Sequence, residues 1–353
     1  MCLHYTGAPD HISAFSCGSR TNVNPYNRTM WEVVGHDRAV ENLRNAISSG
    51  RLPHALLFCG QVGVGKTRLA LELAKALNCT GAEPPCQQCV HCRQIESGGH
   101  PDVTVAEALE GKDSISIAQV RELRDGAALR PFQASFKVII IAGAESLTPQ
   151  AADALLKTLE EPQRQVRIVL TATEPEALPS TVVSRCRVIN LLPATPEVIE
   201  QALVARGESA EQAAVVSQLA RGSVGWAIEA SRHPKVIAER AEIIERMSTV
   251  FELDLASRID LAERMTSERR DRSWVRRNLQ LLVYLTRDLL LIQTGLQPAL
   301  AQGVGRANLE RAAARYSLPQ VEESLEAMRL VMDRVDSNVD PRLALEAMLI
   351  SLP

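Results

Sequence analysis

The chain has 353 residues, which predicts two or three domains at roughly 150 residues each. Its 42 acidic and 39 basic residues give a net charge of −3, which excludes a globally basic nucleic-acid coat. The hydrophobic fraction of 46% argues against overall disorder, and the aromatic fraction of 3% argues against base stacking as the main activity. The longest apolar segment, residues 279–292, is interrupted by Arg287 and Asp288 and is too short to span a bilayer. We therefore expect a folded multidomain protein outside the membrane.

Residues 1–29 lack the continuous apolar centre of a signal peptide. A globular pattern begins at Met30 and Trp31. We expect the preceding segment to be a disordered extension or the result of a misassigned start, which the mass of the native protein would decide.

Strand and helix patterns alternate between residues 30 and 193. Predicted strands cover residues 55–59, 136–142, 166–171 and 188–192, and predicted helices cover residues 38–47, 67–77 and 149–159. This alternation predicts an α/β domain with a parallel sheet that is covered on both faces.

The strand pattern stops after Pro193. Short helical stretches at residues 196–206, 210–220 and 224–231 predict a small three-helix domain over residues 194–234. Longer helical patterns then continue to the end, which predicts an all-α domain over residues 235–353.

Residues 60–67, GQVGVGKT, match the phosphate-binding loop G-x-x-x-x-G-K-[ST], and they stand between a predicted strand and a predicted helix. In such a loop, backbone N–H groups, a helix N-terminus and a lysine surround phosphate oxygens, and the Thr hydroxyl binds Mg²⁺. The predicted cofactor-binding residues are Gly60, Gly63, Gly65, Lys66 and Thr67. A chance glycine turn is the alternative, and the strand–loop–helix context argues against it.

Hydrolysis of ATP requires a carboxylate after a second apolar strand, with a neighbouring acid to orient water. Here the apolar strand runs into Ala142, Gly143 and Ala144, and Glu145 follows too late and is expected to face elsewhere. The sequence therefore predicts binding of ATP and Mg²⁺ without hydrolysis.

Four cysteines follow the spacing Cys79-x6-Cys86-x2-Cys89-x2-Cys92. Four thiolates in this arrangement predict a structural Zn²⁺ site with no open coordination position. Disulfides and free thiols are the alternatives, and disulfides are rare in the cytoplasm, where we expect this protein. His91 is a less suitable replacement ligand. The other cysteines, Cys2, Cys17, Cys59 and Cys186, have no metal-site spacing.

The phosphate loop, the cysteine insertion, the segment ALLKTLEEP at residues 154–162, and Ser184-Arg185-Cys186 occur in this order. Together they resemble subunits of the bacterial sliding-clamp loader of DNA polymerase III, which are AAA+ proteins. The resemblance is strong over about residues 30–193. It implies an AAA+ parallel sheet with a zinc insertion, a helical lid over residues 194–234 and an α-helical collar over residues 235–353.

The resemblance also implies roles for single residues. Val34, Gly35 and His36 would lie near the adenine pocket. Arg185 would be an arginine finger that reaches ATP on a neighbouring subunit, where its forked donors suit the γ-phosphate. An ordinary surface ion pair is the alternative for Arg185.

The chain departs from the ATP-hydrolysing relatives at several points. The acidic pair is missing, and Gly225 stands where those relatives carry a lid arginine after a Gly-Ser pair. The polar sensor after the third strand has more than one possible register, Thr171 or Thr173. These departures imply a non-hydrolysing subunit that acts as a stator.

The implied partners are the gamma/tau and delta subunits in a hetero-pentameric ring, and the sliding clamp and primed DNA through that complex. One alternative is an ATP-hydrolysing motor subunit in which Glu145 or Asp153 serves the metal. Another is a zinc-dependent DNA-binding module, which the few aromatics and low basicity disfavour. Local basic residues such as Arg121, Arg124 and Arg130 could contact a phosphate backbone, but solvated helix charge is the expected explanation for them.

Overall fold

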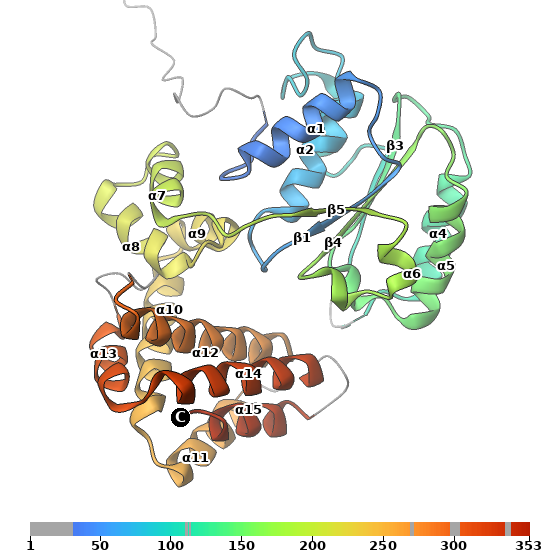
Figure 1. Cartoon of the computed structure of the whole chain (residues 1–353). Coiled ribbons are helices and arrows are strands. Elements are labelled where there is room, and N and C mark those ends of the chain that lie inside the picture. The colour runs from blue at the N-terminus through green and yellow to red at the C-terminus, as the bar shows by residue number, and fades with distance from the viewer. Residues whose placement is uncertain (1–30, 110–111, 113, 269–271, 297–303, 336–339) are drawn as a thin grey trace, which may run out of the picture.

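The computed structural model describes residues 31–109, 112, 114–268, 272–296, 304–335 and 340–353. Its described part comprises a sheet domain, a small group of short helices and a larger group of long helices (Figure 1). The expectation for residues 1–29 lies outside the described residues. No helix among those described is long and apolar enough to cross a membrane.

The described sheet has five strands in the order β2-β3-β4-β1-β5, and all its pairings are parallel. The strands are β1 (Ala55–Cys59), β2 (Val103–Ala106), β3 (Lys137–Ile141), β4 (Val166–Ala172) and β5 (Arg187–Asn190). Four of them match predicted strands, and the parallel α/β arrangement is confirmed. Strand β2 lies at the edge and was not predicted from the sequence.

Helices cover both faces of this sheet, as the almost entirely apolar strands require. They are α1 (Asp37–Ser48), α2 (Lys66–Asn78), α3 (Val90–Glu96), α4 (Ile117–Ala127), α5 (Pro149–Glu160) and α6 (Ser180–Val183), with short 3₁₀ turns η1 (Ala144–Ser146) and η2 (Pro175–Ala177). Alternate residues of β1 enter different cores: Phe58 packs in the core with α1 and α2, and Leu57 packs in the core with α4 and α5. Figure 1 shows these two layers on opposite sides of the sheet.

Three short helices follow β5, where a small three-helix domain was expected, and we call these helices the lid below. They are α7 (Pro196–Val204), α8 (Ala210–Ala220) and α9 (Val224–Ser231). Their common core includes Ile199, Val216 and Ala227. Ser209 and Ser223 cap α8 and α9 by accepting a backbone N–H, which fixes where these helices begin.

The remaining described elements are helical, as predicted for the C-terminal region. They are α10 (Pro234–Ser248), η3 (Thr249–Glu252), α11 (Leu255–Glu268), α12 (Arg272–Gln293), α13 (Arg306–Arg315), α14 (Leu318–Val335) and α15 (Pro341–Ile350). Their core contains Phe251, Leu282 and Leu345, all fully buried. Leu219 of α8 and Trp226 of α9 also pack against this core, so the lid and the C-terminal helices are in direct contact.

Candidate nucleotide and metal sites

The phosphate loop connects the end of β1 to the start of α2. Gly65 is the N-cap of α2 and has φ +114°, and Gly63 has φ +76°, conformations that favour glycine. The loop therefore presents its backbone at a helix N-terminus, where the helix dipole favours an anion. This geometry fits a nucleotide phosphate.

Lys66 folds over the loop that precedes it. Its Nζ donates to the carbonyl oxygens of Gly60 at 2.5 Å and Gln61 at 2.9 Å. The full positive charge thus lies within the predicted phosphate site, with Thr67 next to it in the first turn of α2. The structure brings the five predicted loop residues together.

The segment predicted to border the adenine lies between the loop and the lid. His36 is buried, and its Nε2 donates to the carbonyl oxygen of Val64 at 2.8 Å. Burial lowers the pKa of His36 below its ordinary value of 6.5, against the opposing effect of this bond. Val34 packs against the lid core, and a Cβ on Gly35 would approach Ala194 within 3.1 Å. The role of these residues in base binding stays a prediction.

The end of β3 shows why hydrolysis is not expected. Ala142 and Gly143 follow the strand directly, at the carboxyl edge of the sheet where metal-binding acids would stand. The Gly143 N–H donates to the buried hydroxyl of Thr171 at 3.0 Å. The hydroxyl of Thr171 is therefore engaged by the neighbouring strand end. Thr173 lies just beyond β4, where its carbonyl accepts the N–H of Gly60 at 3.0 Å.

Glu145 lies near enough to Cys59, the last residue of β1, for its charge to act on that thiol. The charges of both Lys66 and Glu145 act on the thiol of Cys59, whose pKa is raised to about 11, chiefly by burial. One carboxylate oxygen of Glu145 is buried and has no hydrogen-bond partner among the described residues. Glu145 is thus the acid beyond β3 with spare capacity to accept a ligand.

The lid contacts the phosphate loop through the start of α9. The Gly225 N–H donates to the carbonyl oxygen of Gly63 at 2.8 Å. The side chain of Ser223 lies so close that a Cβ on Gly63 would meet its Oγ at 2.0 Å. We call this pairing of Gly63 with Ser223 and Gly225 the loop–lid contact.

Gln61 of the loop joins the sheet domain to both other regions. Its Nε2 donates to the carbonyl oxygen of Arg221 at 2.8 Å, and its Oε1 accepts the hydroxyl of Tyr284 on α12 at 2.6 Å. The guanidinium of Arg221 forms a buried ion pair with Asp288 of α12 at 2.7 Å. Sequence reasoning missed these contacts, because no motif links positions so far apart.

Arg185 follows α6 and lies partly exposed at the surface of the sheet domain. Its Nη2 donates to Oε1 of Glu160 at 2.6 Å, and its Nη1 donates to the carbonyl oxygen of Thr181 at 2.8 Å. Within this chain Arg185 therefore takes part in the surface ion pair that was the alternative to a finger role. Its predicted action on a neighbouring subunit stays a prediction.

The four predicted zinc ligands converge after α2. The Sγ atoms of Cys79, Cys86, Cys89 and Cys92 all lie within 4.8 Å of one another. Cys79 is the C-cap of α2 and Cys92 lies in α3, so two helices fix the ends of the cluster. The spacing prediction is thus confirmed as a geometric cluster.

The backbone around the cluster donates N–H groups to its sulfurs, whereas burial raises the pKa of the Cys79 and Cys92 thiols. Sγ of Cys79 accepts N–H groups from Gly81 at 3.3 Å and Cys86 at 3.2 Å, and Sγ of Cys86 accepts the N–H of Cys89 at 3.3 Å. Burial opposes ionisation of Cys89, but hydrogen bonds from Cys92 and Thr80 outweigh it and lower its pKa to about 5. Four convergent sulfurs with N–H donors are the donor set that Zn²⁺ takes in structural sites. The residues present fit that ion.

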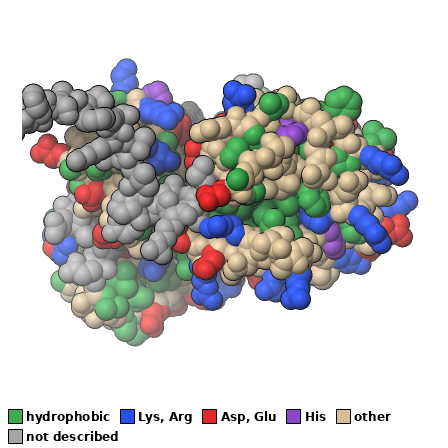
Figure 2. Space-filling view, turned by 90° about the horizontal axis from the view of Figure 1, so that it is seen from above, with side chains coloured by type: hydrophobic (Ala, Val, Ile, Leu, Met, Phe, Trp, Pro, Cys, Tyr) green, Lys and Arg blue, Asp and Glu red, His purple; other side chains and the backbone are tan. Residues whose placement is uncertain are grey.

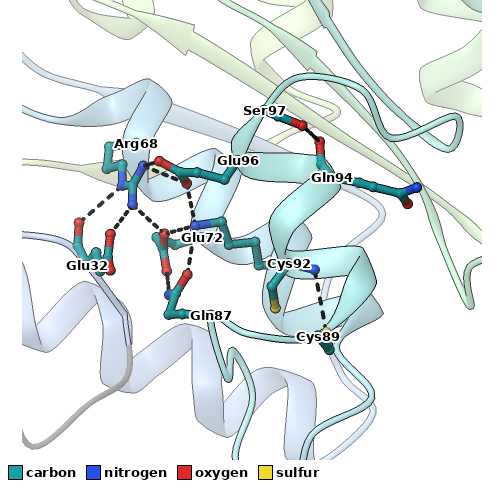
Figure 3. A network of polar contacts seen from close by, with 10 residues as sticks. Glu32, Arg68, Glu72, Gln87, Cys89, Cys92, Gln94, Glu96 and Ser97 are labelled. Atoms are coloured by element: carbon teal, nitrogen blue, oxygen red, sulfur yellow. Dashed lines mark hydrogen bonds and ion pairs between the residues drawn. The ribbon is translucent and has the colours of Figure 1, made fainter.

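A buried polar network fastens this cysteine module to α2 (Figure 3). Glu72 and Lys75 of α2 are almost fully buried and pair at 2.8 Å. Gln87, between two of the cysteines, donates to Glu72 at 2.7 Å and accepts from Lys75 at 2.8 Å. Arg68 and Glu96 complete the network at its exposed side. The module is therefore linked to the helix that starts at the phosphate loop.

The surface does not favour the zinc-dependent DNA-binding alternative. On the face shown in Figure 2, Lys and Arg side chains are dispersed among acidic and neutral ones. Arg124 pairs with Asp125 at 2.9 Å on the exposed side of α4, as expected for solvated helix charges. Nucleic-acid backbones are bound by clustered cations, whereas many of the Lys and Arg side chains of the described residues on this face lie beside acidic or neutral ones.

Comparison with known proteins supports the resemblance noted from the motifs. Residues 35–195 match the family described as DNA polymerase III, delta subunit. DNA polymerase III subunit delta′ of Bacillus subtilis is 29% identical over 318 residues, which cover 89% of this chain and 95% of that protein. Subunit tau of Escherichia coli is 41% identical over 161 residues, which cover 45% of this chain and 25% of tau.

The extent of these matches separates the two kinds of relative. The chain spans nearly the whole of subunit delta′ but only about a quarter of tau. Among solved structures, a DNA polymerase III gamma subunit-related protein from Thermotoga maritima covers 87% of this chain and 97% of its own at 18% identity and a TM-score of 0.45, values too low to add to this comparison. The resemblance predicted from the motifs is therefore confirmed: this chain is similar to the delta′ subunit of DNA polymerase III over most of its length.

Proposed function

We propose that this chain is a clamp-loader subunit of the bacterial DNA polymerase III holoenzyme, which helps to load the sliding clamp onto primed DNA. It would bind ATP and Mg²⁺ without hydrolysing ATP, and offer Arg185 to ATP on a neighbouring subunit. The observation that carries the proposal is the combination of a complete phosphate loop with Ala142 and Gly143 where two acids would be needed.

The loop–lid contact supports a stator role. Gly225 offers a backbone N–H to the loop in place of a charged side chain that could sense a γ-phosphate. Gln61 and Tyr284 further tie the loop to α12. The loop is thus bonded to Gly225, Arg221 and Tyr284. These contacts restrict how far the lid and the C-terminal helices can rotate relative to the sheet domain when nucleotide binds, so we propose that the chain is a comparatively rigid member of the ring.

The proposal extends to partners and cofactors. The partners are gamma/tau and delta subunits in a hetero-pentameric ring, with the C-terminal helices as the collar, in the cytoplasm. The cysteine module would hold one structural Zn²⁺, because its four thiolates leave no position for a substrate.

The test compares ATP turnover by the purified chain with turnover by the complex reconstituted with the other loader subunits. We expect negligible turnover by the chain alone. Arg185→Ala should lower the turnover of the complex and leave its assembly intact. An arginine finger raises the rate of ATP hydrolysis at the site it contacts on the order of 10³-fold or more. Without Arg185 that one site should be nearly inactive, so the complex should lose the share of its turnover that this site contributes. Arg187→Ala, an exposed arginine two residues away, is the matched control.

A motor subunit is the second candidate, because the buried carboxylate oxygen of Glu145 has no hydrogen-bond partner among the described residues. In that case the isolated chain would hydrolyse ATP at rates of ordinary ATPases, and Glu145→Gln would abolish the activity. Asp153, the other acid considered, lies exposed on α5. Absence of turnover by the wild-type chain would exclude this candidate.

A further inference from the structure

The guanidinium of Arg185 is held from two sides within its own chain. Nη2 donates to Glu160 at the end of α5, and Nη1 donates to Thr181 and, at 3.3 Å, to the hydroxyl of Ser184. Both terminal nitrogens, which would have to reach a phosphate on another subunit, are therefore engaged in this state.

Glu160 carries a negative charge at a place where such a charge is unfavourable. It is the last residue of α5, and Glu161 follows as the C-cap. Carboxylates at a helix C-terminus face the negative end of the helix dipole, which is unfavourable. The positive charge of Arg185 offsets this repulsion, so the pairing suits both partners in the absence of a neighbouring subunit.

Arg185 can also leave Glu160 for another acceptor at little cost in free energy. The side chains of Arg185 and Glu160 are 35% and 48% exposed, respectively. Water screens such exposed ion pairs, which contribute little to stability. A triphosphate carries more negative charge than one carboxylate and accepts the same forked donors.

We propose that Glu160 competes within the chain for Arg185 and holds it away from the neighbouring subunit until bound triphosphate displaces the carboxylate. This inference rests on the proposed action of Arg185 in trans. Since the guanidinium cannot lie against Glu160 and reach a phosphate on another subunit at the same time, the fraction of free Arg185 limits how often the finger is engaged. Glu160 is then a positioning residue that acts through Arg185.

The test measures kcat for ATP in the reconstituted complex. Glu160→Gln and Glu160→Ala should each raise kcat about 1.5- to 5-fold, the range expected from releasing an exposed ion pair. Assembly of the complex, followed by gel filtration, should be unchanged. Glu161→Gln removes a neighbouring exposed charge without touching Arg185 and should leave kcat at the wild-type value.

A double substitution separates this inference from the function on which it rests. If Glu160 acts through Arg185, Glu160→Gln should have no effect in the Arg185→Ala background. If Arg185→Ala lowers kcat but Glu160→Gln behaves like Glu161→Gln, or lowers kcat, the competition is wrong and the finger role stands. If Arg185→Ala itself leaves kcat unchanged, the proposed action in trans fails.

Discussion

The amide nitrogen of Gly225 lies 2.8 Å from the carbonyl oxygen of Gly63, so the first turn of the lid helix α9 is bonded directly to the phosphate loop. A Cβ at position 225 would meet that oxygen at 3.2 Å. A side chain at this position would therefore press on the loop, and the loop–lid contact would have to widen by a few tenths of an ångström.

Gly225→Arg should weaken the loop–lid contact. A large side chain pressed against the backbone of Gly63 forces α9 away, and such overpacking costs about 1–3 kcal/mol of the free energy of unfolding. Urea denaturation measures this loss. Gly126→Ala in α4 is the control, because a Cβ there meets nothing within 4 Å and should be neutral or stabilising by up to about 1 kcal/mol. Equal stability of Gly225→Arg and wild type would contradict the importance of the contact.

Tyr284→Phe should destabilise the junction of the loop with α12. The substitution leaves Oε1 of Gln61 without its donor in a partly buried site, which costs about 1–3 kcal/mol. A double-mutant cycle with Gln61→Leu, measured by thermal unfolding, should give a coupling energy of about 0.5–3 kcal/mol. Additive effects of the two substitutions would show that the hydrogen bond does not form in solution.

Local signals account for what the sequence predicted correctly. The strand β1, the phosphate loop and the start of α2 follow one another within a short segment, where apolar runs and glycines directly specify the conformation. The cysteine spacing likewise predicts the convergence of four sulfurs. Strand β2 was missed because, at the sheet edge, its two middle residues, Thr104 and Val105, are exposed and the apolar run is short.

Contacts between distant segments had no signal in the sequence. Gln61 and Tyr284 are 223 positions apart. Gln61 stands at a variable position of the loop motif and Tyr284 stands in a long helix, so many residue types would fit the local pattern at either position. The buried carboxylate of Asp102 is a similar case, since it accepts the N–H groups of Phe132, Gln133 and Ala134. Only the packing of folded elements brings such groups together, so they had to be found in the structure.

Lys75→Met should be strongly destabilising, although the lysine lies in a helix where methionine is well tolerated. Removal of the cation takes away one of the groups that balance the charge of the buried Glu72 carboxylate. Breaking a buried ion pair in this way lowers the free energy of unfolding by about 3–5 kcal/mol. The double substitution Glu72→Leu and Lys75→Met removes both charges and should recover much of the loss. Chemical denaturation of the three proteins measures these effects, and a double variant less stable than Lys75→Met would refute the interpretation.

The protein should lose stability as the pH falls below about 6.5, and His36 should contribute to this loss. Its pKa is lowered in the folded chain, mainly by burial, so the unfolded chain binds the proton more readily. Stability from the neutral ring is therefore fully present above the unfolded pKa of about 6.5 and decreases as the pH falls towards the folded pKa. Thermal unfolding from pH 7.5 to 5.5 measures the slope. His36→Gln, which retains an N–H donor but does not titrate, should show a shallower decrease; an identical slope would exclude His36 as a source.

Loss of the metal should affect more than the cysteine module. Cys92→Ser removes a buried ligand from α3, and the freed module no longer fixes Gln87 against Glu72 and Lys75. We expect the zinc content, measured by atomic absorption, to fall from about one ion per chain to near zero, and the free energy of unfolding to fall by more than about 2 kcal/mol.

The control for this experiment is Cys186→Ala, which removes a thiol outside the cluster and should retain the metal. A chelator should destabilise the wild-type protein and Cys186→Ala alike, but should not destabilise Cys92→Ser further. If Zn²⁺ binds the folded cluster as proposed, each thiol must lose its proton on binding, so the stabilisation by added zinc should also increase with pH. A Cys92→Ser protein that retains zinc and wild-type stability would show that the four sulfurs converge without forming a metal site.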